Sequence, residues 1–177
     1  MNENNFLVIS LVRDLTDGTL LVIREKSNLA RARRPQDFFP SNMKSIGENE
    51  VQCAIRVTFE QTGIVIKNPK EVSRIKVEME DKEKNYEVVV FLSTEFSGSI
   101  HPSASTDVIW LSLSTPGRHP LPGEDISTYM VWSEEEPVKA DGQIVGFVLH
   151  KILAGKYVRG VYYYSNDKFF DTEVRIL

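Results

Sequence analysis

The sequence has few cysteines, no long apolar run and no large excess of charge of either sign. Its 177 residues include one cysteine, Cys53, which excludes an internal disulfide and a metal site built from several thiolates. No stretch approaches the roughly 18 consecutive apolar residues of a membrane helix, and the amino end lacks the basic segment of a signal peptide. The net charge of −4 argues against a nonspecific nucleic-acid coat. We therefore expect a cytoplasmic protein without a membrane partner.

The length and composition fit one folded domain. Domains commonly run to ~100–200 residues, and this chain of 177 lies within that range. Hydrophobic residues make up 41% and charged residues 26%, which is ordinary for a globular protein. A chain of this size buries enough surface to fold without a structural metal. No internal repeat or linker divides it, so we expect a single domain over residues 1–177.

Apolar runs predict several strands. The runs 6–13 and 20–26 flank a turn containing Asp-Gly, which predicts two antiparallel strands joined as a hairpin. The segment 27–45 contains two closely spaced prolines and several arginines, so it predicts a basic loop. Further strands are predicted over 71–76, 86–95 and 108–113, and a long Pro- and Gly-rich loop over 115–125.

Helical periodicity predicts two helices. Over 48–62 a mostly apolar stripe recurs at helical spacing, and Gly63 follows where helices often end. The stripe consists of Val51, Ala54, Ile55, Thr58 and Thr62. A second helix is predicted over 141–153, stopped by Gly155. After it, the apolar segments 157–164 and 169–177 predict a C-terminal hairpin.

The most specific pattern surrounds the first helix. Glu48 follows Gly47, Arg56 lies eight positions after Glu48, and Glu60, Gly63 and Ile64 continue the register. This spacing resembles the Nudix box, the motif of hydrolases that use divalent cations to cleave nucleoside diphosphates linked to another group. The resemblance implies an α/β fold, a Nudix-like α/β/α sandwich with a mixed sheet. It follows the order of elements over 6–154, so 155–177 would be an extra C-terminal β-hairpin.

The chain departs from the box where the family carries acids. Val57 and Gln61 stand at two glutamate positions, and Ser41 and Asn42 stand where the family has glycines. Positions 57, 60 and 61 are related as i, i+3 and i+4, so we expect them to face one cleft. Mg²⁺ prefers oxygen ligands and neutralises a diphosphate. With Glu60 as the remaining carboxylate, we expect weak Mg²⁺ binding there and lost or strongly reduced hydrolysis.

The resemblance also assigns roles to the other box residues. Glu48, Arg56 and Glu60 would be the residual catalytic set, in which Glu48 orients Arg56 or supports the loop. The alternative for Glu60 is a solvated helix carboxylate. Cys53 fits a small apolar position in the helix, which favours packing over reactivity.

Ligand contacts are expected from the loop before the box. Its arginine forks would suit phosphate oxygens without a metal, and the alternative is a solvated basic loop. Phe39 is a candidate for stacking on a base, with core packing as its alternative. The predicted ligand-binding residues are Arg31, Arg33, Arg34, Phe39 and Lys44.

Three functions remain open from the sequence. The first is binding of a nucleotide or nucleoside-diphosphate-linked ligand with little or no hydrolysis. The second is an active Mg²⁺-dependent Nudix pyrophosphohydrolase with a rearranged metal site. The third is a protein-interaction module of a larger complex. The aromatic C-terminal hairpin is either a homodimer surface, a lid over the cleft or an edge that covers the core.

Overall fold

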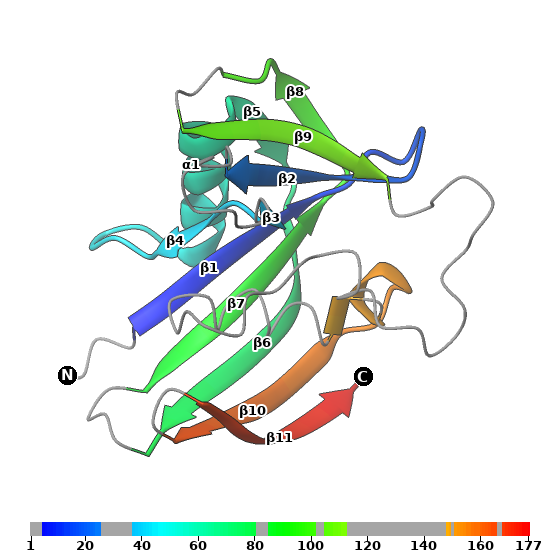
Figure 1. Cartoon of the computed structure of the whole chain (residues 1–177). Helices are drawn as coiled ribbons and strands as arrows, with labels where there is room; N and C mark the ends of the chain where they lie inside the picture. Colours follow the sequence, from blue (N-terminus) through cyan, green and yellow to red (C-terminus); the bar gives the residue numbers. More distant parts are fainter. Residues whose placement is uncertain are drawn as a thin grey trace, which may run out of the picture.

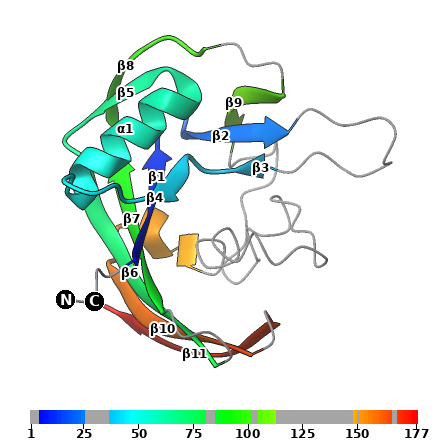
Figure 2. The ribbon, with the colours of Figure 1, turned by 90° about the vertical axis from the view of Figure 1, so that its left-hand side faces the viewer.

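The computed structural model describes residues 5–25, 37–80, 85–101, 105–112, 148–149, 151–165 and 168–177. One long helix, α1 (Glu50–Thr62), lies beside a large twisted sheet (Figure 1). Residues 148–149 and 151–153 are helical and lie inside the curve of that sheet (Figure 2). The strands are β1 (Asn5–Val12), β2 (Thr19–Glu25), β3 (Asp37–Phe38), β4 (Ser41–Met43), β5 (Ile64–Lys67), β6 (Lys70–Met79), β7 (Tyr86–Ser93), β8 (Glu95–Gly98), β9 (Thr106–Ser112), β10 (Val158–Ser165) and β11 (Lys168–Ile176).

The strands form one large mixed sheet and two small antiparallel ones. The six-stranded sheet has the order β11-β10-β6-β7-β1-β4. Within it β1 runs parallel to β7 and β10 runs parallel to β6, while the other neighbours are antiparallel. The second sheet has the order β3-β2-β9, and β5 pairs with β8. This arrangement confirms the predicted α/β fold with a mixed sheet.

Alternating side chains of the central strands build a core on each face of the large sheet. On β1, Val8 and Val12 pack with α1, whereas Leu7, Ile9 and Leu11 pack on the opposite face. We call the first face the α1-side core; its buried residues are Val8, Val12, Leu21, Cys53, Ala54, Val57, Ile64, Ile66, Val89 and Phe91. We call the other the hairpin-side core; its buried residues are Leu7, Ile9, Leu11, Leu20, Val22, Phe39, Ile75, Val77, Val88, Val90, Val148, Leu149, Ile152, Val158, Tyr162 and Tyr164. The period of two along each strand produces this division.

The predicted N-terminal hairpin is wrong in its pairing. The turn forms, with Gly18 at φ 73° and an Asp14 amide donating to the Thr19 carbonyl over 2.9 Å. Beyond one isolated bridge between Arg13 and Leu20, however, β1 and β2 separate into different sheets. The reason is that β7 and β4 occupy the two edges of β1.

Helix α1 begins two residues later than predicted because Asn49 caps it. The Asn49 side chain accepts from the Gln52 amide at 2.8 Å, and the Gln52 side chain accepts from the Asn49 amide at 2.8 Å. This reciprocal capping box satisfies two amides that the first turn leaves free. The helix ends as predicted at Gly63, which has φ 81°. The buried face is rotated from the predicted stripe, since Val51 is 40% exposed while Cys53 and Val57 are buried.

The C-terminal hairpin is confirmed. Strand β10 pairs with β11 in antiparallel register from Val158 opposite Ile176 to Ser165 opposite Lys168. The strands predicted around 71–76, 86–95 and 108–113 correspond to β6, β7 and β9. Two short strands, β3 and β4, lie within the segment predicted to be a loop. The predicted loop 115–125 and the start of the predicted helix 141–153 lie outside the described residues.

Candidate functional site

The loop before α1 and the first turns of the helix bring Glu48 and Arg56 together. Arg56 lies two turns into the helix, so its long side chain reaches back past the cap to residue 48. Arg56 Nε donates to Glu48 Oε2 at 3.0 Å, and Nη2 donates to Oε1 at 2.5 Å. The planar guanidinium fits the carboxylate as a two-pronged pair. The Ser45 amide donates to the same Oε1 at 2.6 Å, so the pair also holds the loop.

The pair has a clear electrostatic consequence. The hydrogen bonds from Arg56 lower the pKa of Glu48 to about 2, although partial burial works in the opposite direction. The carboxylate in turn raises the pKa of Arg56 above its ordinary value. Both groups are therefore charged across the physiological pH range.

Glu60 lies on the exposed side of α1 and pairs with the same arginine. Arg56 Nη1 donates to Glu60 Oε2 at 3.0 Å, and the Glu60 side chain is 53% exposed. One guanidinium thus bridges both acids that the box retains. The structure brings the predicted set of Glu48, Arg56 and Glu60 together.

Gln61 uses both ends of its amide to hold β4. Gln61 Nε2 donates to the Ser41 carbonyl at 2.9 Å, and the Ser41 amide donates to Gln61 Oε1 at 3.1 Å. The side chain therefore acts like a short piece of strand backbone, paired with a residue twenty positions away. A glutamate has no donor to offer the Ser41 carbonyl, so it cannot make this contact as a carboxylate.

Val57 does not line an open cleft with its neighbours. Its side chain is fully buried in the α1-side core, where it packs with Ala54 and strand residues. We expected positions 57, 60 and 61 to face one cleft. Instead, the Val57 side chain is buried against the sheet, whereas the Glu60 side chain is exposed. The helix is rotated so that position 57 faces the sheet, and a valine suits that place.

The predicted ligand-binding residues are only partly described. Arg31, Arg33 and Arg34 lie outside the described residues. Phe39 is 4% exposed and belongs to the hairpin-side core, so in this structure its ring packs in the core rather than stacking on a ligand.

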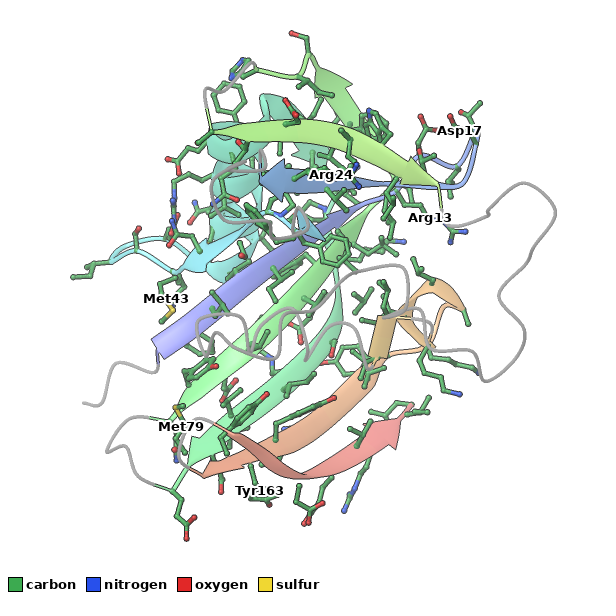
Figure 3. The ribbon with its side chains drawn as sticks, in the orientation of Figure 1. Arg13, Asp17, Arg24, Met43, Met79 and Tyr163 are labelled. Atoms are coloured by element: carbon green, nitrogen blue, oxygen red, sulfur yellow. The ribbon has the colours of Figure 1, made fainter. Side chains whose placement is uncertain are left out.

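Lys44 is half-buried at the end of β4, close to α1. Its ammonium lies 4.8 Å from the centre of the Phe6 ring and 3.8 Å from a Glu50 carboxylate oxygen. Met43, the last residue of β4 and the neighbour of Lys44 in the sequence, is labelled in Figure 3. The Lys44 ammonium therefore lies near the start of α1, where it forms an ion pair with Glu50.

Cys53 is buried beneath the Glu48–Arg56 pair. Its burial, together with the nearby Glu48 charge, raises the pKa of the thiol to about 12. The sulfur lies 3.6 Å from Arg56 Nη2. The thiol is therefore protonated at neutral pH and packs as a small apolar group.

The donor set does not fit a cluster of divalent cations. Of the three helix positions 57, 60 and 61, one is an apolar core residue, one is an acid paired with arginine, and one is an amide whose oxygen already accepts a hydrogen bond. Across the described part of the chain, no group of three or more His, Cys, Asp or Glu side chains is placed to hold a metal ion.

Two serines hold the site through contacts that the sequence did not predict. Ser41 contributes its backbone to Gln61, and Ser45 contributes its amide to Glu48 with its hydroxyl 3.3 Å from Arg56 Nη2. Backbone contacts of this kind leave no signal in residue type. The sequence does signal where the loop that contains Ser45 ends, because Asn49 is a residue type that commonly caps the start of a helix.

Solved structures resemble most of the chain in fold, at low sequence identity. The mutator MutT protein from Bacillus halodurans superposes with a TM-score of 0.68 at 18% identity, covering 96% of this chain and 97% of its own. MutT from the fish pathogen Aliivibrio salmonicida or from Vibrio cholerae, which one structural study treats together, superposes with a TM-score of 0.57 at 12% identity, covering 86% of this chain and 99% of its own. The chain has the Nudix fold.

The likeness is one of fold, because no family model matches the sequence and no curated protein matches it. Helix α1 carries most of the residues that resemble the box. In this chain they include an arginine paired with two acids, a buried valine and a glutamine bound to the β4 backbone. Among the described residues no helix is long and apolar enough to cross a membrane.

Proposed function

We propose that this Nudix-fold protein binds a nucleotide or nucleoside-diphosphate-linked ligand, holds divalent cations weakly and hydrolyses such a ligand slowly or not at all. The observation that carries the proposal is the pairing of the Gln61 amide with the Ser41 backbone. At a position where the resembled box has an acid, this chain has a neutral group whose donor and acceptor are both in use.

The neighbouring positions support the same conclusion. A carboxylate at Val57 would be buried away from water, which is costly for an unpaired charge. Glu60 keeps its negative charge, but Arg56 balances that charge locally. A cation entering here would meet one partly neutralised carboxylate, and a hard ion such as Mg²⁺ binds poorly to so few anionic oxygens.

The first test measures cation binding directly. Calorimetric titration and the electron paramagnetic resonance spectrum of Mn²⁺ should show dissociation constants no tighter than about millimolar for the unaltered protein. Gln61→Glu should bind Mn²⁺ more tightly, because the new carboxylate joins Glu60 on the same helix. Gln61→Met removes both hydrogen bonds without adding charge and is the matched control. Micromolar binding by the unaltered protein, with several ions bound, would overturn the proposal.

Gln61→Glu is preferred to a change at Val57 for a structural reason. Val57→Glu places a charge in the α1-side core, so loss of folding would obscure any gain in metal binding. Gln61→Glu affects a partly buried contact at the edge of β4. Its cost should be about 1–3 kcal/mol, the usual penalty for leaving one buried polar partner unsatisfied.

The second test measures ligand binding separately from turnover. ADP-ribose, NADH, dinucleoside polyphosphates, capped RNA and oxidised deoxynucleotides are screened by thermal shift and for product release with Mg²⁺ or Mn²⁺. We expect a stabilising ligand whose binding falls when Arg31, Arg33 and Arg34 are changed together to Ala. Lys67→Ala, which removes an exposed charge from β5, should leave binding unchanged. Rapid metal-dependent turnover would establish the active hydrolase instead.

Failure of every nucleotide to bind, with capture of one stable partner protein, would favour the interaction module. The two tests are independent, because weak cation binding can be confirmed even if the ligand class is wrong.

A further inference from the structure

The last strand of the chain, β11, forms one edge of the large sheet. Strand β11 stands at the end of the strand order, and within the described residues it pairs only with β10 (Figure 1). Its edge lies at the far side of the sheet from β4. An unpaired strand edge presents backbone donors and acceptors that can pair with another chain.

The hydrogen-bond pattern identifies which backbone groups point outward. The Leu177 amide donates to the Tyr157 carbonyl at 2.9 Å, and the Tyr157 amide donates to the Leu177 carbonyl at 3.3 Å. In an antiparallel ladder such two-bond pairs recur at every second residue. The backbone groups of 171, 173 and 175 therefore point toward β10, and those of 172, 174 and 176 point to the open edge.

Two apolar side chains of β11, Val174 and Ile176, lie on the face of the sheet that carries the hairpin-side core. Val174 lies opposite Gly160 and Ile176 lies opposite Val158, which is itself fully buried in that core. Val174 is nevertheless 39% exposed and Ile176 is 47% exposed. One further strand beside β11 would extend the apolar surface that these two residues begin.

The opposite face of β11 carries charges that complement one another. Glu173 and Arg175 alternate with the apolar residues and are exposed. Arg175 lies directly opposite Arg159 on β10, and like charges in that position are unfavourable. A carboxylate placed next to Arg175 from outside the sheet would offset this repulsion.

We propose that β11 pairs with β11 of a second copy of this chain, antiparallel about a two-fold axis at Val174. The outward backbone groups of 174 then bond each other, and those of 172 bond those of 176. Glu173 of each copy lies opposite Arg175 of the other, at closely spaced positions where side chains interact most strongly. Val174 of each copy meets its counterpart on the apolar face. An isologous contact of this kind closes a dimer.

Charge selects this register from the alternatives. Outward groups must face outward groups, so the axis falls on a residue rather than between two, and the positions nearest the middle of the exposed edge are 173, 174 and 175. An axis at 173 sets Asp171 opposite Arg175 but brings Glu173 against itself at the centre of the contact, and an axis at 175 brings Arg175 against itself. An axis at 174 brings two opposite-charge pairs together and no like-charge pair.

The test uses the whole chain in sedimentation equilibrium from about 1 to 500 µM. We expect a reversible monomer–dimer equilibrium, weakened about tenfold or more by Glu173→Arg or by Arg175→Glu, because each change converts both pairs to like charges. The double variant Glu173→Arg with Arg175→Glu should restore dimerisation. A protein that stays monomeric at every concentration overturns the proposal, and single variants that dimerise normally overturn the register.

Cysteine cross-linking provides an independent readout. Val174→Cys places two thiols across the axis at a separation that a disulfide spans, since facing residues of such a pair are ~5.5 Å apart. Ile176→Cys is the matched control, because its two copies lie four residues out of register. We expect oxidation to give a covalent dimer for the first variant and little for the second. Equal cross-linking of both variants, or cross-linking of the control alone, contradicts an axis at Val174. Circular dichroism confirms that all variants are folded.

Discussion

The Glu48–Arg56 pair makes a residue-scale prediction about pH. Because the pKa of Glu48 is lowered to about 2, its contribution to stability is complete above the unfolded value of ~4.3. That contribution is lost as the pH falls from about 5 through 2. Glu48→Gln should therefore destabilise the protein most at pH 7, less at pH 3 and least near pH 2, measured as the free energy of unfolding in urea. Glu80→Gln, at an exposed turn residue, serves as the control. A penalty for Glu48→Gln that does not change with pH would refute this account.

Residue contacts at the site were only partly predictable from the sequence. The resemblance to the box predicted that Glu48 orients Arg56 or supports the loop, and the structure shows a two-pronged pair. The pairing of Gln61 with Ser41 was not predictable, because its partner is backbone from a strand twenty residues away. The prediction that Val57 lines a cleft was wrong. Helical spacing gives the directions of side chains relative to one another, but which of them point inward depends on how α1 packs on the sheet.

At the scale of the element, the end of α1 depends on Gly63. Gly63 has φ 81°, and an added Cβ would lie 2.3 Å from the Ser99 carbonyl oxygen and 2.6 Å from the His101 ring. Gly47 has φ 86° but nothing within 4 Å of its added Cβ. Both changes to Ala incur about 1 kcal/mol for the left-handed backbone, whereas Gly63→Ala also forces β8 and the residues after it to move. We expect Gly63→Ala to lower the unfolding free energy by about 3 kcal/mol or more. Equal losses for both variants in urea unfolding would show that the contact is unimportant.

Elements with strong local signals were predictable, whereas pairing between segments far apart in the sequence was not. The helix, its glycine stop and the C-terminal hairpin follow from periodicity and turn residues within short windows of sequence. The strands β3, β4, β5 and β8 are short, and their pairing depends on distant neighbours. Likewise, the turn at Gly18 predicted that the chain reverses direction between β1 and β2. It did not predict that β1 pairs with β7 and that the two strands therefore belong to different sheets.

At the scale of the whole molecule, the C-terminal hairpin is joined to the sheet by the parallel pairing of β10 with β6. Tyr162 on β10 is 1% exposed and packs in the same core as Leu11 on β1 and Val90 on β7. Residues near both ends of the described chain thus share one apolar cluster. Such shared packing favours unfolding of the hairpin together with the central strands, since neither retains its core without the other.

This packing yields a prediction for a pair of neighbouring tyrosines. Tyr162→Ala should lower the free energy of unfolding by about 3–5 kcal/mol, the usual loss for a large buried aromatic side chain. Tyr163, labelled in Figure 3, points to the other face of β10 and is only partly buried, so Tyr163→Ala should cost about 1 kcal/mol. Amide hydrogen exchange shows which strands and helices lose stability in the variant. In Tyr162→Ala we expect faster exchange in β1, β7 and α1 as well as in β10, because the two cores share the strands of one sheet. Faster exchange confined to β10 and β11 would show instead that the hairpin opens independently of the rest of the fold.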